Sequence, residues 1–178
     1  MWLCMPRLDG SPVFDALLGG DGVFRVELEN CVTTRQRYIE NTAILETELE
    51  AADGSVVRLV DFAPRFTARG RNFFPAAFVR RVIPVKGAPL IRVRISPQDN
   101  WGGGAMAVDR GVSHLSYAGD GARFRVTSDA PMSYVGDGSW FILDKPYAFV
   151  FGPDEALSDM PGVIAEEWES RRSSQSPA

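Results

Sequence analysis

The sequence predicts an all-β fold, an antiparallel β-sandwich with a short N-terminal helix and a C-terminal helix. Two observations support this fold. Apolar and polar residues alternate in many short runs, as they do in strands with one buried face. Glycine-containing turn signals interrupt these runs at short intervals, for example at residues 119–121 and 136–138. Many short strands separated by such turns are typical of an antiparallel sandwich or barrel.

The clearest predicted element is a hairpin in the first third of the chain. Residues 45–50 alternate leucine or threonine with glutamate, and residues 56–62 return as the partner strand. Asp53-Gly54 lies between the two runs, and this dipeptide is among the strongest short signals of a hairpin turn. Pro64 ends the second strand, because proline has no N–H to donate to a ladder.

A short helix is expected before this hairpin, over residues 11–18. Ser11 can cap it, Pro12 suits its first turn, and residues 13–18 supply one apolar face before two glycines. Residues 66–75 and 101–104 are expected to be loops. The remaining strands are expected at residues 24–28, 31–38, 77–85, 90–96, 106–109, 113–117, 122–127, 133–135, 139–143 and 147–151.

The C-terminal segment has a different pattern. Residues 158–172 are expected to be helical, since Ile164 and Trp168 lie one turn apart, and a polar tail follows at 173–178. Adjacent Glu166 and Glu167 point in different directions on a helix, which favours a solvated face. We therefore expect a β-sandwich domain over residues 1–157 and a linker helix with its tail over 158–178.

Composition and charge argue against several function classes. A net charge of −4 argues against nucleic-acid binding, which needs a basic face. No apolar run approaches the roughly 20 residues of a membrane span, and no export signal is evident, so a cytoplasmic protein without a membrane partner is expected. Cys4 and Cys31 do not indicate a disulfide framework, and both are expected to be small core residues.

Residue types that carry catalysis or bind metals are sparse. The one histidine, His114, lies in an alternating run, where a structural role is expected. No metal or cofactor is expected, because soft ligands do not cluster and the glycines at 102–104 lack the rest of a phosphate loop. Four aromatic residues are interpreted as core filling, with sugar stacking as the alternative: Trp101, Tyr117, Tyr134 and Trp140.

Two long motifs resemble a known family. Residues 2–18, WLCMPRLDGSPVFDALL, are similar to the run WLC-x-PRFDSPSVFAALL of bacterial and archaeal glucoamylase/trehalase-type proteins, glycoside hydrolase family 15. Residues 36–38 (QRY), 45–47 (LET) and 61–65 (DFAPR) resemble, in the same order, that family's segment QRY…TNVLET…DFMPR. Residues 80–93 are similar to its next hairpin, so the resemblance covers nearly the whole chain.

The resemblance implies an accessory domain of an inverting α-glucosidase, glucoamylase or trehalase. In that family the segment is an N-terminal β-sandwich, which a helical linker joins to an (α/α) catalytic barrel. The catalytic glutamates belong to the barrel, so no catalytic residue is carried over and the chain alone is expected to be inactive. The alternatives are an autonomous carbohydrate-binding module, for which Trp101 and Trp140 would stack on an α-glucoside, and a stand-alone assembly protein.

The first motif is expected to lie towards the barrel. The resemblance therefore implies that Trp2, Arg7 and Asp9 belong to the interface with the catalytic domain or to the rim of its active site. A local ion pair between Arg7 and Asp9 is the alternative interpretation.

A homo-oligomer is also expected. Family members usually carry another strand pair before the first motif, and this sequence starts one residue before Trp2. A strand without its neighbour presents unpaired N–H and C=O groups, so we expect a homodimer or a higher oligomer through a sheet edge or the former barrel face. The arginine- and phenylalanine-rich residues 66–75 are expected contributors to that interface.

Overall fold

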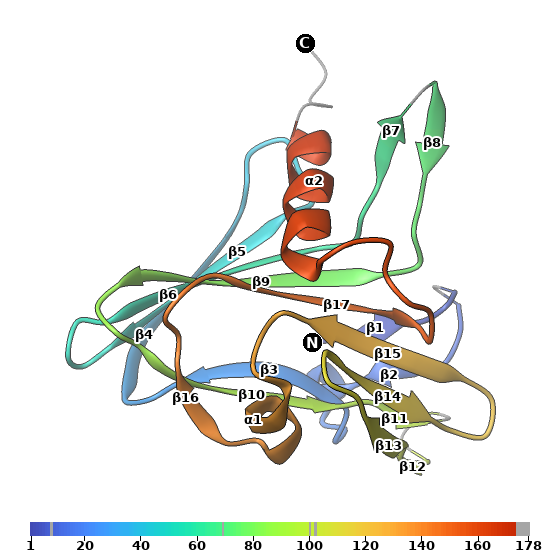
Figure 1. Ribbon diagram of the computed structural model, residues 1–178, viewed down its shortest axis with the longest axis horizontal. Coiled ribbons are helices and arrows are strands. Elements are labelled where there is room, and N and C mark those ends of the chain that lie inside the picture. Colours follow the sequence, from blue (N-terminus) through green and yellow to red (C-terminus); the bar gives the residue numbers. More distant parts are fainter. Residues whose placement is uncertain (8, 69, 100, 102, 174–178) are drawn as a thin grey trace.

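Two antiparallel sheets of unequal size face each other in the computed structural model, which describes all residues except 8, 69, 100, 102 and 174–178 (Figure 1). The larger sheet has, in spatial order, β13 (Ala107–Arg110), β14 (His114–Ala118), β15 (Arg123–Ser128), β17 (Tyr147–Pro153), β9 (Phe78–Lys86), β6 (Val56–Phe62), β5 (Leu45–Ala51) and β4 (Cys31–Tyr38). The smaller sheet has β16 (Trp140–Ile142), β10 (Leu90–Ser96) and β3 (Val23–Leu28). This arrangement confirms the predicted all-β sandwich.

The main core fills the space between the two sheets. Strands expose alternate residues on opposite faces, so each strand contributes every second side chain to this space. The smaller sheet contributes six buried residues: Phe24, Val26, Leu28, Ile91, Val93 and Phe141. They pack in one cluster with buried residues of the larger sheet, including Val57, Leu59, Val82, Leu115, Val126, Phe149 and Phe151.

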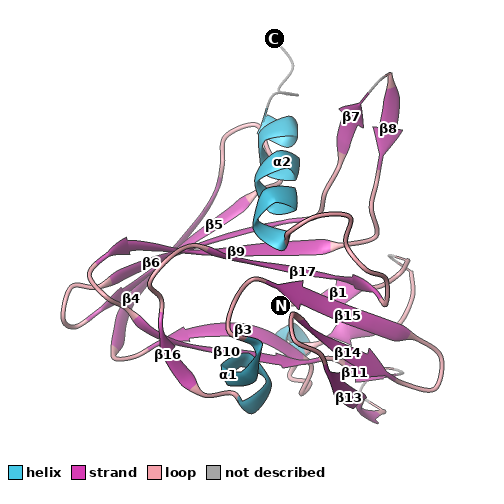
Figure 2. Ribbon diagram, viewed as in Figure 1, coloured by secondary structure: helices cyan, strands magenta, loops and turns pink. Residues whose placement is uncertain are grey.

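Helix α2 (Pro161–Ser173) covers part of the outer face of the larger sheet (Figures 1 and 2). Ala165 is fully buried against outward-facing residues of the sheet such as Val60 and Val79. Arg81 of β9 donates hydrogen bonds to Glu166 and Glu169, at 2.9 and 2.5 Å, and so ties the helix to the sheet. The predicted C-terminal helix is confirmed, and residues 174–178 of the predicted tail lie outside the described residues.

The solvated face predicted for the helix is confirmed, since Glu166 and Glu167 are both exposed, and Glu166 also accepts a hydrogen bond from Arg81 of β9. Glu167 pairs instead with Arg171, one turn further along the same helix. Within the described residues, no helix has the length and hydropathy needed to cross a membrane.

The central hairpin has the predicted form. Strands β5 and β6 pair in antiparallel register, with Leu49 opposite Val57. Gly54 in the turn has a φ of 81°, a left-handed conformation that glycine adopts without strain. The Asp53 carboxylate accepts the Ser55 N–H at 2.8 Å, and this hydrogen bond lowers the pKa of Asp53. The turn residues and the alternating pattern of the two strands therefore specify the same hairpin.

The helix predicted over residues 11–18 is wrong. Residues Pro12–Phe14 form strand β2, which pairs with β1 (Leu3–Cys4). The helical part of this segment is limited to one 3-10 turn, η1 (Ala16–Leu18). Val13 and Phe14 are buried in the main core, whereas Leu17 and Leu18 are exposed. Pairing with β1 therefore decided the local structure, and the helix-like spacing of the apolar residues did not mark one buried face.

Three other segments also differ from the prediction. The strand predicted at residues 133–135 lies in helix α1 (Met132–Asp137), in which Met132 and Val135 are buried one turn apart. The loop predicted at residues 66–75 contains a hairpin of β7 (Phe66–Ala68) and β8 (Arg71–Phe73), which projects beside α2 (Figure 1). The loop predicted at 101–104 ends in β12 (Gly104–Ala105), which pairs with β11 (Gln98–Asp99).

Candidate functional site

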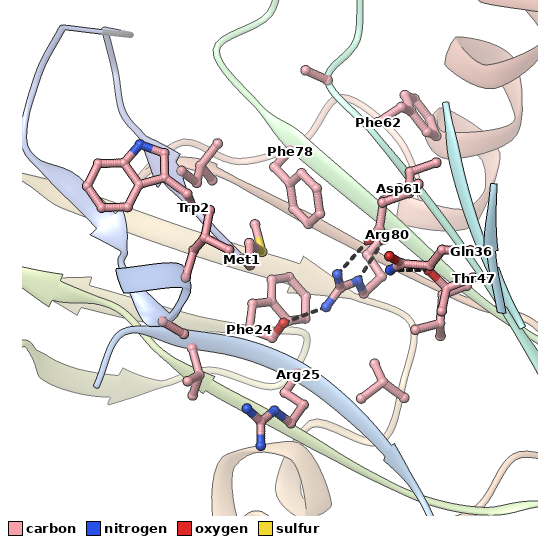
Figure 3. Close-up of a pocket in the computed structure, with 18 of the residues that line it drawn as sticks. Met1, Trp2, Phe24, Arg25, Gln36, Thr47, Asp61, Phe62, Phe78 and Arg80 are labelled. Atoms are coloured by element: carbon pink, nitrogen blue, oxygen red, sulfur yellow. Dashed lines mark hydrogen bonds and ion pairs between the residues drawn. The ribbon is translucent and has the colours of Figure 1, made fainter. Parts of the chain in front are cut away.

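An open groove lies where the smaller sheet stops. Strand β3 is the last strand of that sheet, and the inner faces of β4, β5 and β6 continue beyond it. The resulting groove has a volume of about 850 Å³. Met1 and Trp2 line one end, and Gln36 and Thr47 line the other (Figure 3).

A buried ion pair forms the floor of this groove. Asp61 of β6 and Arg80 of β9 are opposite each other in the ladder, and their side chains are 11% and 9% exposed. Arg80 donates two hydrogen bonds to the Asp61 carboxylate, from Nε at 2.7 Å and from Nη2 at 2.6 Å. Two parallel bonds of this kind fix both side chains in one geometry. Both oxygens of Asp61 are therefore engaged.

The same guanidinium connects the two sheets. Its Nη1 donates to the backbone carbonyl of Phe24 in β3 at 2.6 Å. It also lies 4.7 Å from the ring centroid of Phe24 and 5.4 Å from that of Phe78, within the range of cation–π attraction. Figure 3 shows Arg80 between Asp61 and Phe24. The edge of β3 is thus held against the larger sheet by a charged side chain.

Neutral polar groups line the far part of the groove. Gln36 of β4 donates from Nε2 to Thr47 Oγ1 of β5 at 2.9 Å, and Tyr38 at the end of β4 is exposed. Among the described residues that line the groove, Asp61 is the only acidic one. Glycoside hydrolysis by the usual mechanism needs two carboxylates on either side of the bond. This groove can hydrogen-bond a neutral ligand, but it does not supply that pair.

Arg7 and Asp9, which the sequence placed at a domain interface, form a local ion pair. Arg7 donates from Nε and Nη2 to the two oxygens of Asp9 at 2.9 and 3.0 Å, and the side chains are 77% and 72% exposed. These hydrogen bonds hold the pKa of Asp9 below its usual value. This geometry matches the alternative interpretation, a local ion pair, and it also leaves the Arg7 guanidinium and the Asp9 carboxylate accessible to a partner.

The Trp2 ring contacts Trp101. Their ring centroids are 6.1 Å apart at an interplanar angle of 55°. Trp140, the other residue predicted to stack on sugars, lies on β16 with the Arg92 guanidinium 4.7 Å above its ring. The fold therefore brings together Trp101, predicted as a sugar-stacking residue, and Trp2, predicted as an interface residue.

The expected core positions of several residues are only partly correct. Tyr117 is buried, and its hydroxyl donates to the Ile95 carbonyl at 3.2 Å. Trp101, Tyr134 and Trp140 are exposed, so core filling is wrong for these three. Cys31 is also exposed, because it starts edge strand β4. Within the described part of the chain, no three His, Cys, Asp or Glu side chains are grouped to hold a metal ion.

Sequence reasoning missed the pair of Asp61 and Arg80, although both lie within quoted motifs. Residues 57, 59 and 61 alternate with the outward-facing residues of β6, and the first two are apolar and buried. A carboxylate at the third inward position was the available signal, because a buried charge requires a partner. The identity of that partner depends on the register between β6 and β9.

Comparisons with known proteins identify the family. The family described as trehalase-like, N-terminal, matches residues 1–144, which include every strand from β1 to β16 and exclude β17 and α2. Comparisons with curated proteins and with solved structures each returned no match. Because the match covers most of the chain, with all of the smaller sheet and every strand of the larger sheet except β17, the chain belongs to the trehalase-like N-terminal domain family.

Proposed function

We propose that this chain is the non-catalytic N-terminal accessory domain of a glucoamylase/trehalase-like enzyme of glycoside hydrolase family 15. In this proposal the domain packs on and supports an (α/α) catalytic barrel, which cleaves α-glucosidic bonds with inversion in the cytoplasm. The observation that carries the proposal is the family match over residues 1–144. In this proposal α2 is the linker to the barrel. It follows β17, and both elements lie C-terminal to the matched region.

The chemistry of the groove supports a non-catalytic role. Its one acidic residue among those described, Asp61, has both oxygens bound to Arg80. A general acid or base needs a carboxylate that can exchange a proton with substrate. The groove is therefore suited to holding the two sheets together and not to hydrolysis.

The barrel-facing surface in this proposal contains Trp2, Arg7 and Asp9. The bidentate ion pair gives Arg7 and Asp9 a defined geometry at the surface, and Trp2 adds a partly exposed aromatic ring. Tryptophan and arginine are enriched among residues that dominate binding energy at interfaces. A surface with a preformed polar pair and an aromatic anchor suits a domain partner better than it suits bulk solvent.

The test is a binding experiment with a separately produced catalytic barrel of a glucoamylase/trehalase-type enzyme. We expect a one-to-one complex by calorimetry and a raised melting temperature of the barrel. The double substitution Arg7→Ala/Asp9→Ala is expected to weaken the complex by about tenfold or more, the range of an interface anchor. The matched control is Arg110→Ala/Asp137→Ala, which removes another exposed ion pair.

Two results would contradict the proposal. One is the absence of a complex at high micromolar concentrations of both proteins. The other is glucose release from trehalose or maltooligosaccharides by the purified chain, if a substitution of one of its own glutamates removes that activity.

Self-association through β3 is a separate proposal about partners. Among the described strands, β3 pairs only with β10, so its other edge is open towards the groove. Open strand edges are natural sites for pairing with a second copy. We expect a dimer in light scattering across a dilution series, and a constant monomer mass at high micromolar concentration would exclude it.

A further inference from the structure

A second cavity lies beside the groove and shares Trp2 with it. Its volume is about 340 Å³, and its wall includes Trp2, Trp101, Gln98, Asp15, Asp21 and Leu18. These residues come from the N-terminal segment, from the turn around η1 and from the region of β11. We call this cavity the tryptophan cleft.

Two exposed indoles form one side of the tryptophan cleft. Trp2 is 36% exposed and Trp101 is 67% exposed, and the tilt of 55° between the rings leaves ring surface open to the cavity. Trp101 has a φ of 59°, a left-handed conformation that costs free energy for any residue except glycine. An exposed aromatic ring held in a strained backbone conformation contributes little to a core. Such strain concentrates at ligand-binding positions.

Gln98 supplies a hydrogen-bonding group. It is 7% exposed, and its amide atoms are not among the fully enclosed polar atoms that lack a partner in the described part of the chain. An amide that keeps contact with solvent can exchange its water for the hydroxyl groups of a ligand. Because Gln98 lines the tryptophan cleft, its donor and acceptor are placed for a ligand there.

Two carboxylates complete the polar side of the cleft. Asp15 is buried, and its Oδ1 accepts the Gly22 N–H at 2.7 Å, which fixes the carboxylate at the wall. Asp21 lies in the same turn and also lines the cleft. Among the described residues of this wall there is no lysine or arginine. The cleft therefore disfavours phosphates and other anions.

Two indole rings, an amide and two carboxylates together suit a neutral ring that carries several hydroxyl groups. Indole faces stack on the C–H faces of a sugar, while an amide and carboxylates exchange hydrogen bonds with hydroxyl groups, each of which donates and accepts. A quaternary ammonium would also suit tryptophan and aspartate, but it would oppose the N–H₂ donors of Gln98. A cavity of this size holds a small part of an oligosaccharide and leaves the rest in solvent.

We propose that the tryptophan cleft is a binding subsite for a neutral oligosaccharide, with Trp2 and Trp101 as stacking platforms and Gln98 as the orienting hydrogen-bonding group. Binding of a neutral sugar follows from the cleft itself. The narrower class, an α-glucoside, rests on the proposed function. The subsite would keep substrate chains near a catalytic barrel packed beside it.

The test is calorimetric titration of the full chain with maltotriose, trehalose, cellobiose and choline. We expect saturable binding of maltotriose, with weaker binding of cellobiose and none of choline. Trp101→Ala is expected to weaken the affinity about tenfold, because it removes one stacking face. Gln98→Met keeps the side-chain volume, removes the amide and is expected to weaken it several-fold. Trp140→Ala is the matched control, and circular dichroism verifies folding of each variant.

Each other outcome overturns this inference. No saturable heat with any neutral sugar at tens of millimolar means that the cleft is not a sugar site. Binding of choline alone assigns the cleft to a cation. An equal loss of affinity in Trp101→Ala and Trp140→Ala means that sugar binds elsewhere. If maltotriose fails to bind while the catalytic barrel still forms its complex, the proposed function stands and only the subsite is excluded.

Discussion

The inner face of the eight-stranded sheet has a covered half and an open half, and the two halves carry different side chains. Under the smaller sheet, inward positions such as Val82, Val126 and Phe149 are apolar and buried. Beyond β3, the inward positions of β4 include Gln36 and Tyr38, which line the open groove. In both halves the alternation along each strand decides which side chains point inward. Whether an inward side chain is apolar or polar depends on whether the smaller sheet covers that position.

The first prediction compares the covered half directly with the open half. Phe149→Ala is expected to lower the free energy of unfolding by about 3–5 kcal/mol, because it leaves a cavity between the sheets. Tyr38→Ala in the open half is expected to change it by no more than about 0.5 kcal/mol, as at other exposed positions. Urea denaturation measures both values. Similar losses would mean that the open half is covered in solution.

The second prediction concerns the boundary between the halves. Asp61→Ala leaves the Arg80 guanidinium buried without its partner and is expected to cost about 3–5 kcal/mol. The double variant Asp61→Leu/Arg80→Met is expected to recover most of this loss, since an apolar pair needs no compensation. Arg37→Ala removes an exposed guanidinium from Glu46, which still pairs with Arg58, so this control should cost less than about 1 kcal/mol. A double variant as unstable as Asp61→Ala would contradict this account.

The third prediction tests how the outer face is held. Arg81→Ala removes the hydrogen bonds to Glu166 and Glu169 and is expected to cost about 1–3 kcal/mol. Hydrogen exchange should accelerate in α2, while exchange in β10 and β3 of the smaller sheet stays slow. Uniform acceleration across both regions would show that the helix does not open independently of the sandwich.

The fourth and smallest effect is a pH dependence at alkaline pH. Burial raises the pKa of Tyr147 to about 12, and the hydrogen bond from its hydroxyl to Asp144 adds to the shift. An unfolded tyrosine titrates near pH 10, so the folded protein favours the protonated phenol. The corresponding stability is complete below about pH 10 and is lost as the pH rises towards 12.

Tyr147→Phe is therefore expected to reduce the fall in melting temperature over this window. Some dependence should remain, because burial also raises the pKa of Tyr117. Thermal denaturation of both proteins between neutral pH and pH 12 measures the difference. Identical profiles would show that Tyr147 does not titrate differently in the folded state.

Local patterns determined much of the sheet from the sequence alone. The β5–β6 hairpin follows from alternation on both sides of Asp53-Gly54, and β4 was predicted with its observed bounds. In both cases neighbouring residues supply the physical cause, a period of two or a turn conformation. The family followed from motifs that the same sequence carries.

The tertiary structure decided which apolar residues are buried and which distant residues meet. Val13 is buried and Leu17 is exposed because β2 pairs with β1, a contact that no local spacing encodes. The groove exists because the smaller sheet ends at β3, and the tryptophan cleft exists because Trp2 and Trp101 are brought together from distant parts of the sequence. Strand order and sheet packing set these contacts, since they depend on burial summed over the whole chain and not on any one segment.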